Sequence, residues 1–306
     1  QAALFLLHKS PRKHRSAALE CAAMLPRYLF ADVDDTFTVR GGIHADVLDA
    51  VARADRAGME IILNTGRPAG YGATLLAYLP SVSAVIVENG GAWLDRRAQA
   101  PSSFSPSGSA VVTSSHEHGL HYFRPLAPDV RTRLAALQKR VSRRLGRSLT
   151  TTADNQFRVS DYTVVRDLPG GHEGAKMLAE LSRLVEDESD HQGHILASSI
   201  HIHFMLDGDA RRSKAEGAAA LLSRRGVTDA NAELSRYAVS VGDSANDVSL
   251  FAPGRFALSV GVRNIERYLP ELGDSVPQHI TTHSEGFGLC ELITDLLNGR
   301  ISISTS

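Results

Sequence analysis

The sequence predicts an α/β fold, a doubly wound parallel sheet with helices on both faces and an α+β unit inserted into it. Apolar runs alternate with helical patterns over residues 28–92 and again over 214–298. The first apolar runs end abruptly in polar clusters, which is typical of buried strands whose ends face solvent. Strands that alternate with helices indicate a parallel sheet. Between these two regions the pattern changes, which indicates an insertion.

The first α/β region begins with the apolar run at 28–31. Residues 44–56 carry apolar side chains at helical spacing, and Gly58 ends that helix. A short strand at 60–63, a second helix through Leu75 and Leu76, and a strand at 84–87 follow. This strand–helix–strand–helix–strand order is expected to form one half of the parallel sheet.

The middle of the chain reads differently. Residues 98–115 are rich in Ser and Pro and are expected to form a linker or loop. The patterns that follow predict helices at 128–145 and 173–185 and strands at 156–165 and 195–204. The α/β pattern then resumes, with helices at 214–225 and 286–297 and strands at 237–241 and 255–260.

These patterns predict three parts of the chain. Residues 27–94 and 207–306 form the core, 95–206 form the inserted α+β cap domain, and 1–26 form an N-terminal extension. Residue 1 is Gln, and Met24 lies just before the first strand, so the extension is interpreted as an upstream addition or a mis-assigned start. An organellar transit segment is the alternative.

Composition excludes some function classes. The 306-residue chain has a net charge of −1, which provides no electrostatic footprint for nucleic acid or an anionic membrane. It contains no apolar run long enough to span a bilayer. Two cysteines, Cys21 and Cys290, cannot form a disulfide framework, so a reducing cytoplasm is the default location.

Polar groups suited to phosphoryl transfer follow several of the predicted strands. Asp32 and Asp34 lie two residues apart at the end of the first strand, where an extended chain places them on one face. Two carboxylates so close together repel each other unless a cation lies between them or one of them is protonated. A helix N-cap or a solvated acidic turn is the alternative for Asp-x-Asp alone. Thr65 and Lys214 offer a hydroxyl and an ammonium for phosphate oxygens.

Four segments together resemble the motifs of haloacid dehalogenase-like phosphatases. They are Asp32-Val33-Asp34-Asp35-Thr36, Thr65-Gly66-Arg67, Lys214, and Gly242-Asp243-Ser244-Ala245-Asn246-Asp247. The insertion falls between the second and third segments. That placement resembles the branch with sucrose-phosphate, trehalose-phosphate and mannosyl-phosphoglycerate phosphatases and the Cof-like enzymes. The resemblance implies a Rossmann-like core, a cap and a Mg²⁺ cofactor.

The resemblance also implies the catalytic roles. Asp32 would be the nucleophile and a metal ligand, and Asp34 would be the acid/base that touches the metal through its backbone carbonyl. Thr65 and Lys214 would bind the transferring phosphoryl group. Asp35 stands where many relatives have Gly, and its role stays open between strengthening the metal site and capping the following turn.

The remaining implied site residues hold the metal and the substrate. Asp243 would be a metal ligand, with Asp247 as a second ligand or an orienting group, and Asn246 would hold phosphate or Lys214. Side chains at strand ends that face the insertion are candidate substrate contacts: Arg67, Glu88 and Asn89. His201 and His203 share one strand face but have no third ligand at suitable spacing, so they are interpreted as interface or cap-facing residues.

The expected function is a Mg²⁺-dependent phosphatase that acts on a small phosphorylated sugar or glycoside through an aspartyl-phosphate. A sugar phosphomutase of the same superfamily is the main alternative. A non-catalytic binding module is less favoured, because all the carboxylates, Thr65 and Lys214 are present. The expected partner is a small molecule, and the sequence does not indicate the oligomeric state or the identity of the sugar.

Overall fold

The computed structural model describes residues 24–97, 119–122, 127, 129–169, 171–198, 200–208 and 212–303. The predicted linker at 98–115, and the predicted N-terminal extension up to residue 23, lie outside the described residues. Within the described ranges, no helix is both long and apolar enough to cross a membrane.

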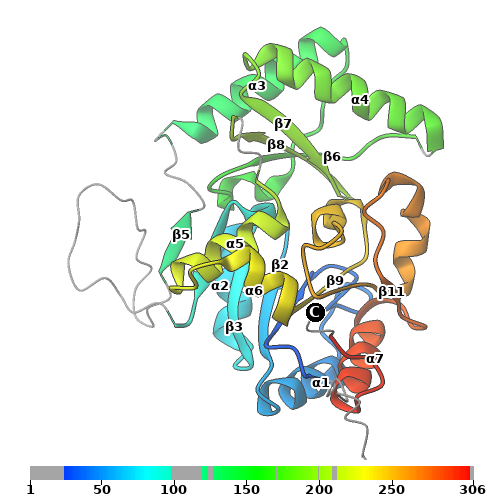
Figure 1. Ribbon diagram of the computed structural model, residues 1–306. Coiled ribbons are helices and arrows are strands. Elements are labelled where there is room, and N and C mark those ends of the chain that lie inside the picture. The colour runs from blue at the N-terminus through cyan, green and yellow to red at the C-terminus, as the bar shows by residue number, and fades with distance from the viewer. Residues whose placement is uncertain are drawn as a thin grey trace, which may run out of the picture.

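The larger sheet has eight strands in the order β11-β10-β9-β1-β2-β3-β4-β5 (Figure 1). The first six of these strands pair in parallel, and β4 and β5 add an antiparallel edge. The strands are β1 (Tyr28–Ala31), β2 (Glu60–Asn64), β3 (Val82–Val87), β4 (Ala92–Asp95), β5 (Leu120–Tyr122), β9 (Ala238–Gly242), β10 (Leu258–Gly261) and β11 (His279–Ile280). The mostly parallel sheet confirms the predicted fold class.

Alternate residues of each strand enter separate hydrophobic cores on the two faces of this sheet. Leu29 of β1 packs in one core, and the next residue, Phe30, packs in the other. Helices α1 (Ala45–Arg56), α2 (Ala69–Tyr78) and α7 (Glu285–Leu297) cover the first face. Helices α5 (Lys214–Arg224) and α6 (Ala230–Tyr237) cover the second. A sheet buried on both faces requires apolar runs without strict alternation, as in Tyr28–Ala31.

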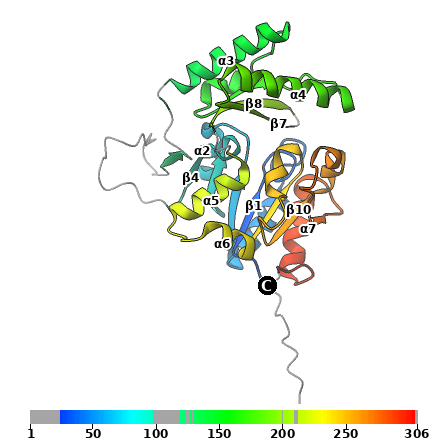
Figure 2. The same cartoon turned by 45° about the horizontal axis from the view of Figure 1, so that its top comes forward.

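A second, three-stranded sheet and two helices lie above one edge of the core (Figure 2), and we call residues 129–206 the cap. Its antiparallel strands are β6 (Tyr162–Val165), β8 (His201–Leu206) and β7 (Gly193–Ala197), in that order. Helices α3 (Val130–Leu145) and α4 (Gly171–Glu188) cover the face that points away from the core. Leu137, Val185 and Phe204 are among the residues of the cap's own apolar core.

Two strand predictions for the insertion were wrong in detail. The predicted strand at 195–204 is the β7–β8 hairpin, because Ser198 turns the chain: its hydroxyl oxygen accepts a hydrogen bond from the His201 N–H (3.0 Å). The predicted strand at 156–165 is a strand only from Tyr162, since Ala153–Phe157 is a 3₁₀ helix. The Asn155 side chain stabilises that helix by bonding both the N–H and the carbonyl of Thr163.

The antiparallel edge of the larger sheet was not predicted. Strand β5, which lies within residues 95–206, pairs with β4 rather than with the cap sheet. Helix α6 and strand β11 were also missed. These four elements, β4, β5, α6 and β11, are short, and their apolar residues are too few to show a period.

The strand order reverses next to β1, which pairs with β2 on one side and β9 on the other. In open α/β sheets the ligand crevice lies outside the carboxyl ends of the strands at such a switch point. Asp32 follows β1 and Asp243 follows β9, and the Asp32 N–H donates to the Val241 carbonyl oxygen (3.0 Å). The topology therefore delivers carboxylates from two distant segments to one place.

Helix α5 depends on a close approach to the turn after β3. A Cβ added at Gly217 would lie 2.6 Å from the Gly90 Cα and 2.9 Å from the Ile86 side chain. We expect Gly217→Ala to lower the free energy of unfolding by about 1–3 kcal/mol, because backbone has to move. Denaturant unfolding would measure this loss.

Gly70→Ala is the matched control, because its Cβ would meet nothing within 4 Å in the first turn of α2. This change is expected to leave stability unchanged or to raise it by about 0.5–1 kcal/mol. Equal stability for the Gly217→Ala variant and the wild type would show that α5 can move away from the turn without cost.

Candidate active site

The turn after β1 places the first carboxylates. Asp32 is almost completely buried, and Asp34 is about one-third exposed. The next residue, Asp35, has φ +55°, a left-handed conformation that Gly adopts most easily and that Asp tolerates. The Asp35 N–H donates to the Thr38 hydroxyl oxygen (3.0 Å). The left-handed backbone of Asp35 and the bond from its N–H to Thr38 thus shape the turn after β1.

Lys214 joins two buried carboxylates at the start of α5. Its Nζ lies 2.6 Å from Asp32 Oδ1 and 2.6 Å from Asp247 Oδ1, and all three side chains are at most 5% exposed. Burial lowers the pKa of Lys214, but the negative charges of Asp247 and Asp32 outweigh burial and hold it above its ordinary value. Lys214 is therefore a fixed cation at the centre of the site.

The segment after β9 supplies Asp243 and Asp247. The second oxygen of Asp247 accepts hydrogen bonds from the backbone N–H groups of Asp243 (2.9 Å) and Ser244 (3.1 Å). Asp247 thus contacts Lys214 with one oxygen and holds two backbone N–H groups with the other, which suits the orienting role among the two left open for it. Asp243 accepts hydrogen bonds from Thr36 (3.2 Å) and Asn264 (3.0 Å).

The three carboxylates Asp32, Asp243 and Asp247 each bring an oxygen within 4.8 Å of the others. Burial, and then the charge of Asp247, raise the pKa of Asp32 to about 7, against the opposing effect of Lys214. Burial and the charges of Asp247 and Asp32 likewise hold the pKa of Asp243 well above its ordinary value. Three buried carboxylates with one ammonium lack a positive charge, and oxygen ligands of this kind fit a divalent cation such as Mg²⁺.

Thr65 follows β2 and is fully buried beside the cavity wall at Gly66. Its hydroxyl oxygen accepts the Arg67 N–H (3.1 Å), so the hydroxyl proton can be donated elsewhere. Asn89 contributes a second donor, because its buried Nδ2 has no hydrogen-bond partner among the described residues. Asn246 Nδ2 lies 3.4 Å from Asn89 Oδ1. The Thr65 hydroxyl and the Asn89 amide can therefore each donate a hydrogen bond to a further group.

Asp34 and Arg67, which the sequence predicts as an acid/base and a substrate contact, bind each other in the structure. Arg67 Nε and Nη2 donate to the two oxygens of Asp34 at 2.9 and 2.7 Å. The bond to Asp34 outweighs burial and raises the pKa of Arg67. Both side chains are about one-third exposed and line the same cavity as Asp32.

Glu88, predicted to contact substrate, lies instead where the cap docks on the core. Its buried carboxylate accepts hydrogen bonds from the N–H groups of Val159 (2.9 Å), Ser160 (2.7 Å) and Asp161 (3.2 Å), and from the Ser160 hydroxyl (2.7 Å). A carboxylate saturated in this way is not free to bind a sugar. The distant loop at 158–161 could not be paired with Glu88 from sequence patterns.

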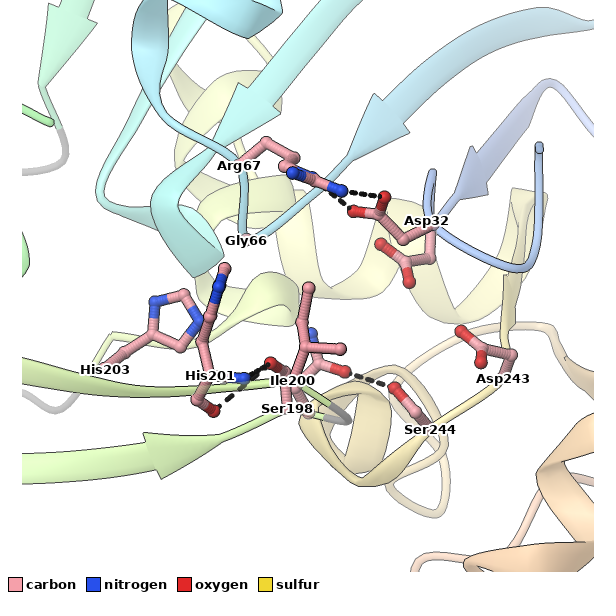
Figure 3. Close-up of a pocket in the computed structure, with 11 residues that line it drawn as sticks. Asp32, Gly66, Arg67, Ser198, Ile200, His201, His203, Asp243 and Ser244 are labelled. Carbon is pink, nitrogen blue, oxygen red and sulfur yellow. Dashed lines mark hydrogen bonds and ion pairs between the residues drawn. The ribbon is translucent and has the colours of Figure 1, made fainter. Parts of the chain in front are cut away.

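The cavity between core and cap has a volume of about 30 Å³, which is room for about two or three water molecules. Its core side is formed by Asp32, Asp34, Gly66, Arg67, Asp243, Ser244 and Asn246, and its cap side by Ser198, Ile200, His201 and His203 (Figure 3). The two histidines therefore do face the site from the cap, as the sequence analysis interpreted them.

Asn264 is a site residue that sequence analysis missed. Its side chain donates to Asp243 Oδ2 (3.0 Å) and the Asp35 carbonyl (3.1 Å), and it accepts the Glu285 N–H (2.9 Å). It thereby connects the β1 turn, the β9 turn and the start of α7. It follows a short strand, like the predicted site residues, but a single Asn three residues beyond the strand is not a distinctive signal.

No protein-family model and no curated protein sequence matches the chain. Solved structures do resemble it. A haloacid dehalogenase-like hydrolase from Bacteroides thetaiotaomicron aligns with a TM-score of 0.58 and 16% identity, over 89% of this chain and 99% of that one. A sucrose-phosphatase from Synechocystis, solved with sucrose and phosphate, aligns with a TM-score of 0.57 and 15% identity, over 89% and 98%.

A haloacid dehalogenase (HAD) subclass IIB sugar phosphatase aligns with a TM-score of 0.55 and 14% identity, over 88% of this chain and 98% of that one. The chain has the HAD fold with a cap. The resemblance drawn from the motifs is confirmed at the level of the fold. Each alignment covers nearly the whole of the neighbouring structure, so this chain contains counterparts of both its core and its cap.

The bonds at Glu88 provide a test of how the cap is held. We expect Glu88→Gln to lower the free energy of unfolding by about 2–4 kcal/mol, because an amide offers one acceptor oxygen and turns an N–H₂ toward the backbone donors of residues 159–161. Thermal unfolding and amide hydrogen exchange at Ser160 would measure the loss.

Glu266→Gln is the control, since that side chain is 56% exposed and its one ion pair among the described residues spans 3.9 Å on the surface. Unchanged exchange at Ser160 in the Glu88→Gln variant would mean that these bonds do not hold the cap.

Proposed function

We propose that this protein is a Mg²⁺-dependent phosphatase that hydrolyses a phosphorylated sugar or glycoside through an aspartyl-phosphate at Asp32. The observation that carries the proposal is the convergence of Asp32, Lys214 and Asp243, from three separate segments, in one buried site. Carboxylates, an ammonium and a hydroxyl are the groups that phosphoryl transfer needs. The HAD fold shared with solved sugar phosphatases supports the same conclusion.

Asp32 and Asp243 would hold Mg²⁺, together with the backbone carbonyl of Asp34, while Asp247 orients the neighbouring groups. The bound ion would neutralise the phosphate and stabilise the charge that develops on it. Lys214 would hold a non-bridging phosphate oxygen while it keeps its contact with Asp32. The Thr65 hydroxyl and the Asn89 amide, with their free donors, would hold the remaining oxygens.

In the first step an oxygen of Asp32 attacks phosphorus and the sugar oxygen leaves with a proton from Asp34. In the second step water attacks the aspartyl-phosphate and gives its proton to Asp34, which releases phosphate and restores Asp32. As the acid, Asp34 would carry a proton on one oxygen and donate it to the sugar oxygen, while its other oxygen keeps its bond from Arg67 and so holds the side chain in place.

The nucleophile is tested by Asp32→Asn. We expect this change to lower kcat for phosphate release by about a thousandfold or more, since an amide cannot form the aspartyl-phosphate. Phosphate release from a panel of sugar phosphates with Mg²⁺ would measure it, and Asp274→Asn, an exposed position, is the control. Full activity of the Asp32→Asn variant, or an inactive wild type, would contradict the proposal.

The metal site is tested without any substrate. Mg²⁺ added to metal-free protein is expected to raise the melting temperature of the wild type, because binding to the folded state alone stabilises it. The shift should vanish in Asp243→Asn, which loses a ligand charge, and persist in Asp274→Asn. The same Mg²⁺ shift in the wild type and in Asp243→Asn would show that Asp243 is not a ligand.

A further inference from the structure

The cap side of the cavity is formed by Ser198, Ile200, His201 and His203 of the β7–β8 hairpin. Ser198 and His201 close the turn: the Ser198 N–H donates to the His201 carbonyl (2.8 Å), and the Ser198 hydroxyl oxygen accepts the His201 N–H (3.0 Å). The turn therefore holds the His201 backbone in one place. The half-buried His201 side chain rises from it toward Gly66 and Arg67 (Figure 3).

A buried network behind His201 fixes the wall on which it stands. The His203 ring packs edge-on to the His201 ring, with their centroids 6.2 Å apart, and His203 Nδ1 lies 2.7 Å from Asp161 Oδ2. Arg158 binds Asp161 (3.0 Å) and the Gly66 carbonyl (2.9 Å), which ties this wall to the core. His201 itself has no side-chain hydrogen bond among the described residues, so its ring nitrogens face the cavity without protein partners.

The described residues that line the cavity offer no free positive charge to a leaving group. Arg67 is their one permanent cation, and its Nε and Nη2 are both directed at the Asp34 oxygens. Arg158, behind the wall, is matched by Asp154 and Asp161. Burial and the neighbouring His203 lower the pKa of His201 to about 4, so its ring is neutral near pH 7.

From this arrangement we infer that His201 is a specificity-determining residue, whose neutral ring hydrogen-bonds a hydroxyl of an uncharged, hydroxyl-rich leaving group. The inference rests on the proposed function and deepens it. A leaving group with a carboxylate or a second phosphate would lie beside Asp32, Asp34 and Asp243 with no unpaired cation on the cap side. Burying such a charge without a partner is costly. The site therefore selects against doubly anionic phosphates.

Two six-carbon probes test the inference, because they differ in one group. Sorbitol 6-phosphate and 6-phosphogluconate both carry phosphate on C6, and at C1 they carry an alcohol and a carboxylate respectively. We expect the wild type to prefer sorbitol 6-phosphate in kcat/KM by about tenfold or more, the usual weight of one unpaired buried charge or polar group. A preference for 6-phosphogluconate, or none, would overturn the inference.

His201→Lys places a cation on the cap wall, and we expect it to reduce or reverse that preference by about tenfold or more. His201→Gln keeps a neutral hydrogen-bonding group and should keep the wild-type preference. His191→Lys is the matched control, since it adds the same charge to the cap at the end of β7 opposite to the tip. Because each result is a ratio for one enzyme, a partly unfolded variant does not distort it.

An unchanged ratio in His201→Lys would refute the role of this residue. Hydrolysis of 4-nitrophenyl phosphate separates this outcome from a failure of the proposed function. A wild type that hydrolyses this ester with Mg²⁺, but neither of the C6 phosphates or both equally, contradicts only the specificity inference. A wild type that releases phosphate from no ester contradicts both.

Discussion

The contact of Lys214 with Asp32 and Asp247 is the constraint on which the rest of the site depends. An ammonium and two carboxylates, all buried, are tolerable only while each keeps its partners, because an uncompensated buried charge costs several kcal/mol. The contact therefore requires the end of β1, the start of α5 and the turn after β9 to stay in register. With Asp243 beside them, the site holds three carboxylates and one ammonium, and this excess of negative charge favours a bound cation.

The sheet explains how this register arises. Asp32 and Asp243 follow neighbouring parallel strands, and the Asp32 N–H continues the β1–β9 ladder to the Val241 carbonyl. Helix α5 approaches closely enough for Lys214 to reach both carboxylates, because Gly90 and Gly217 leave room between backbones. The position of a charged group thus depends on glycines and apolar strands that never touch a ligand.

Sequence patterns predicted the parts of the site that are local. A buried run that ends in polar residues placed Asp32, and the same reasoning placed Thr65 and Asp243. The pairings between distant segments could not be predicted in this way. The sequence predicted Glu88 as a free strand-end carboxylate, yet most of its hydrogen-bond partners lie 71 to 73 residues away in the cap. Spacing also favoured one long strand over the hairpin, because a turn closed by a Ser198 hydroxyl has no Gly or Pro to mark it.

The cap is fastened to the core at more than one place, and these contacts also determine how His201 is held. The loop at 158–161 is bound through the buried Glu88 carboxylate and through Arg158 on the Gly66 carbonyl. The hairpin is held by an ion pair of Arg166 with the partly exposed Glu271 at 3.5 Å, a kind worth little, and by packing of β7 against the segment Ala245–Leu250. His203, two residues beyond His201 in β8, is bound to Asp161 and through it to Arg158. The wall that carries His201 therefore depends on the buried network more than on the surface ion pair, so the contacts that dock the cap also position the residue that we infer contacts the leaving group.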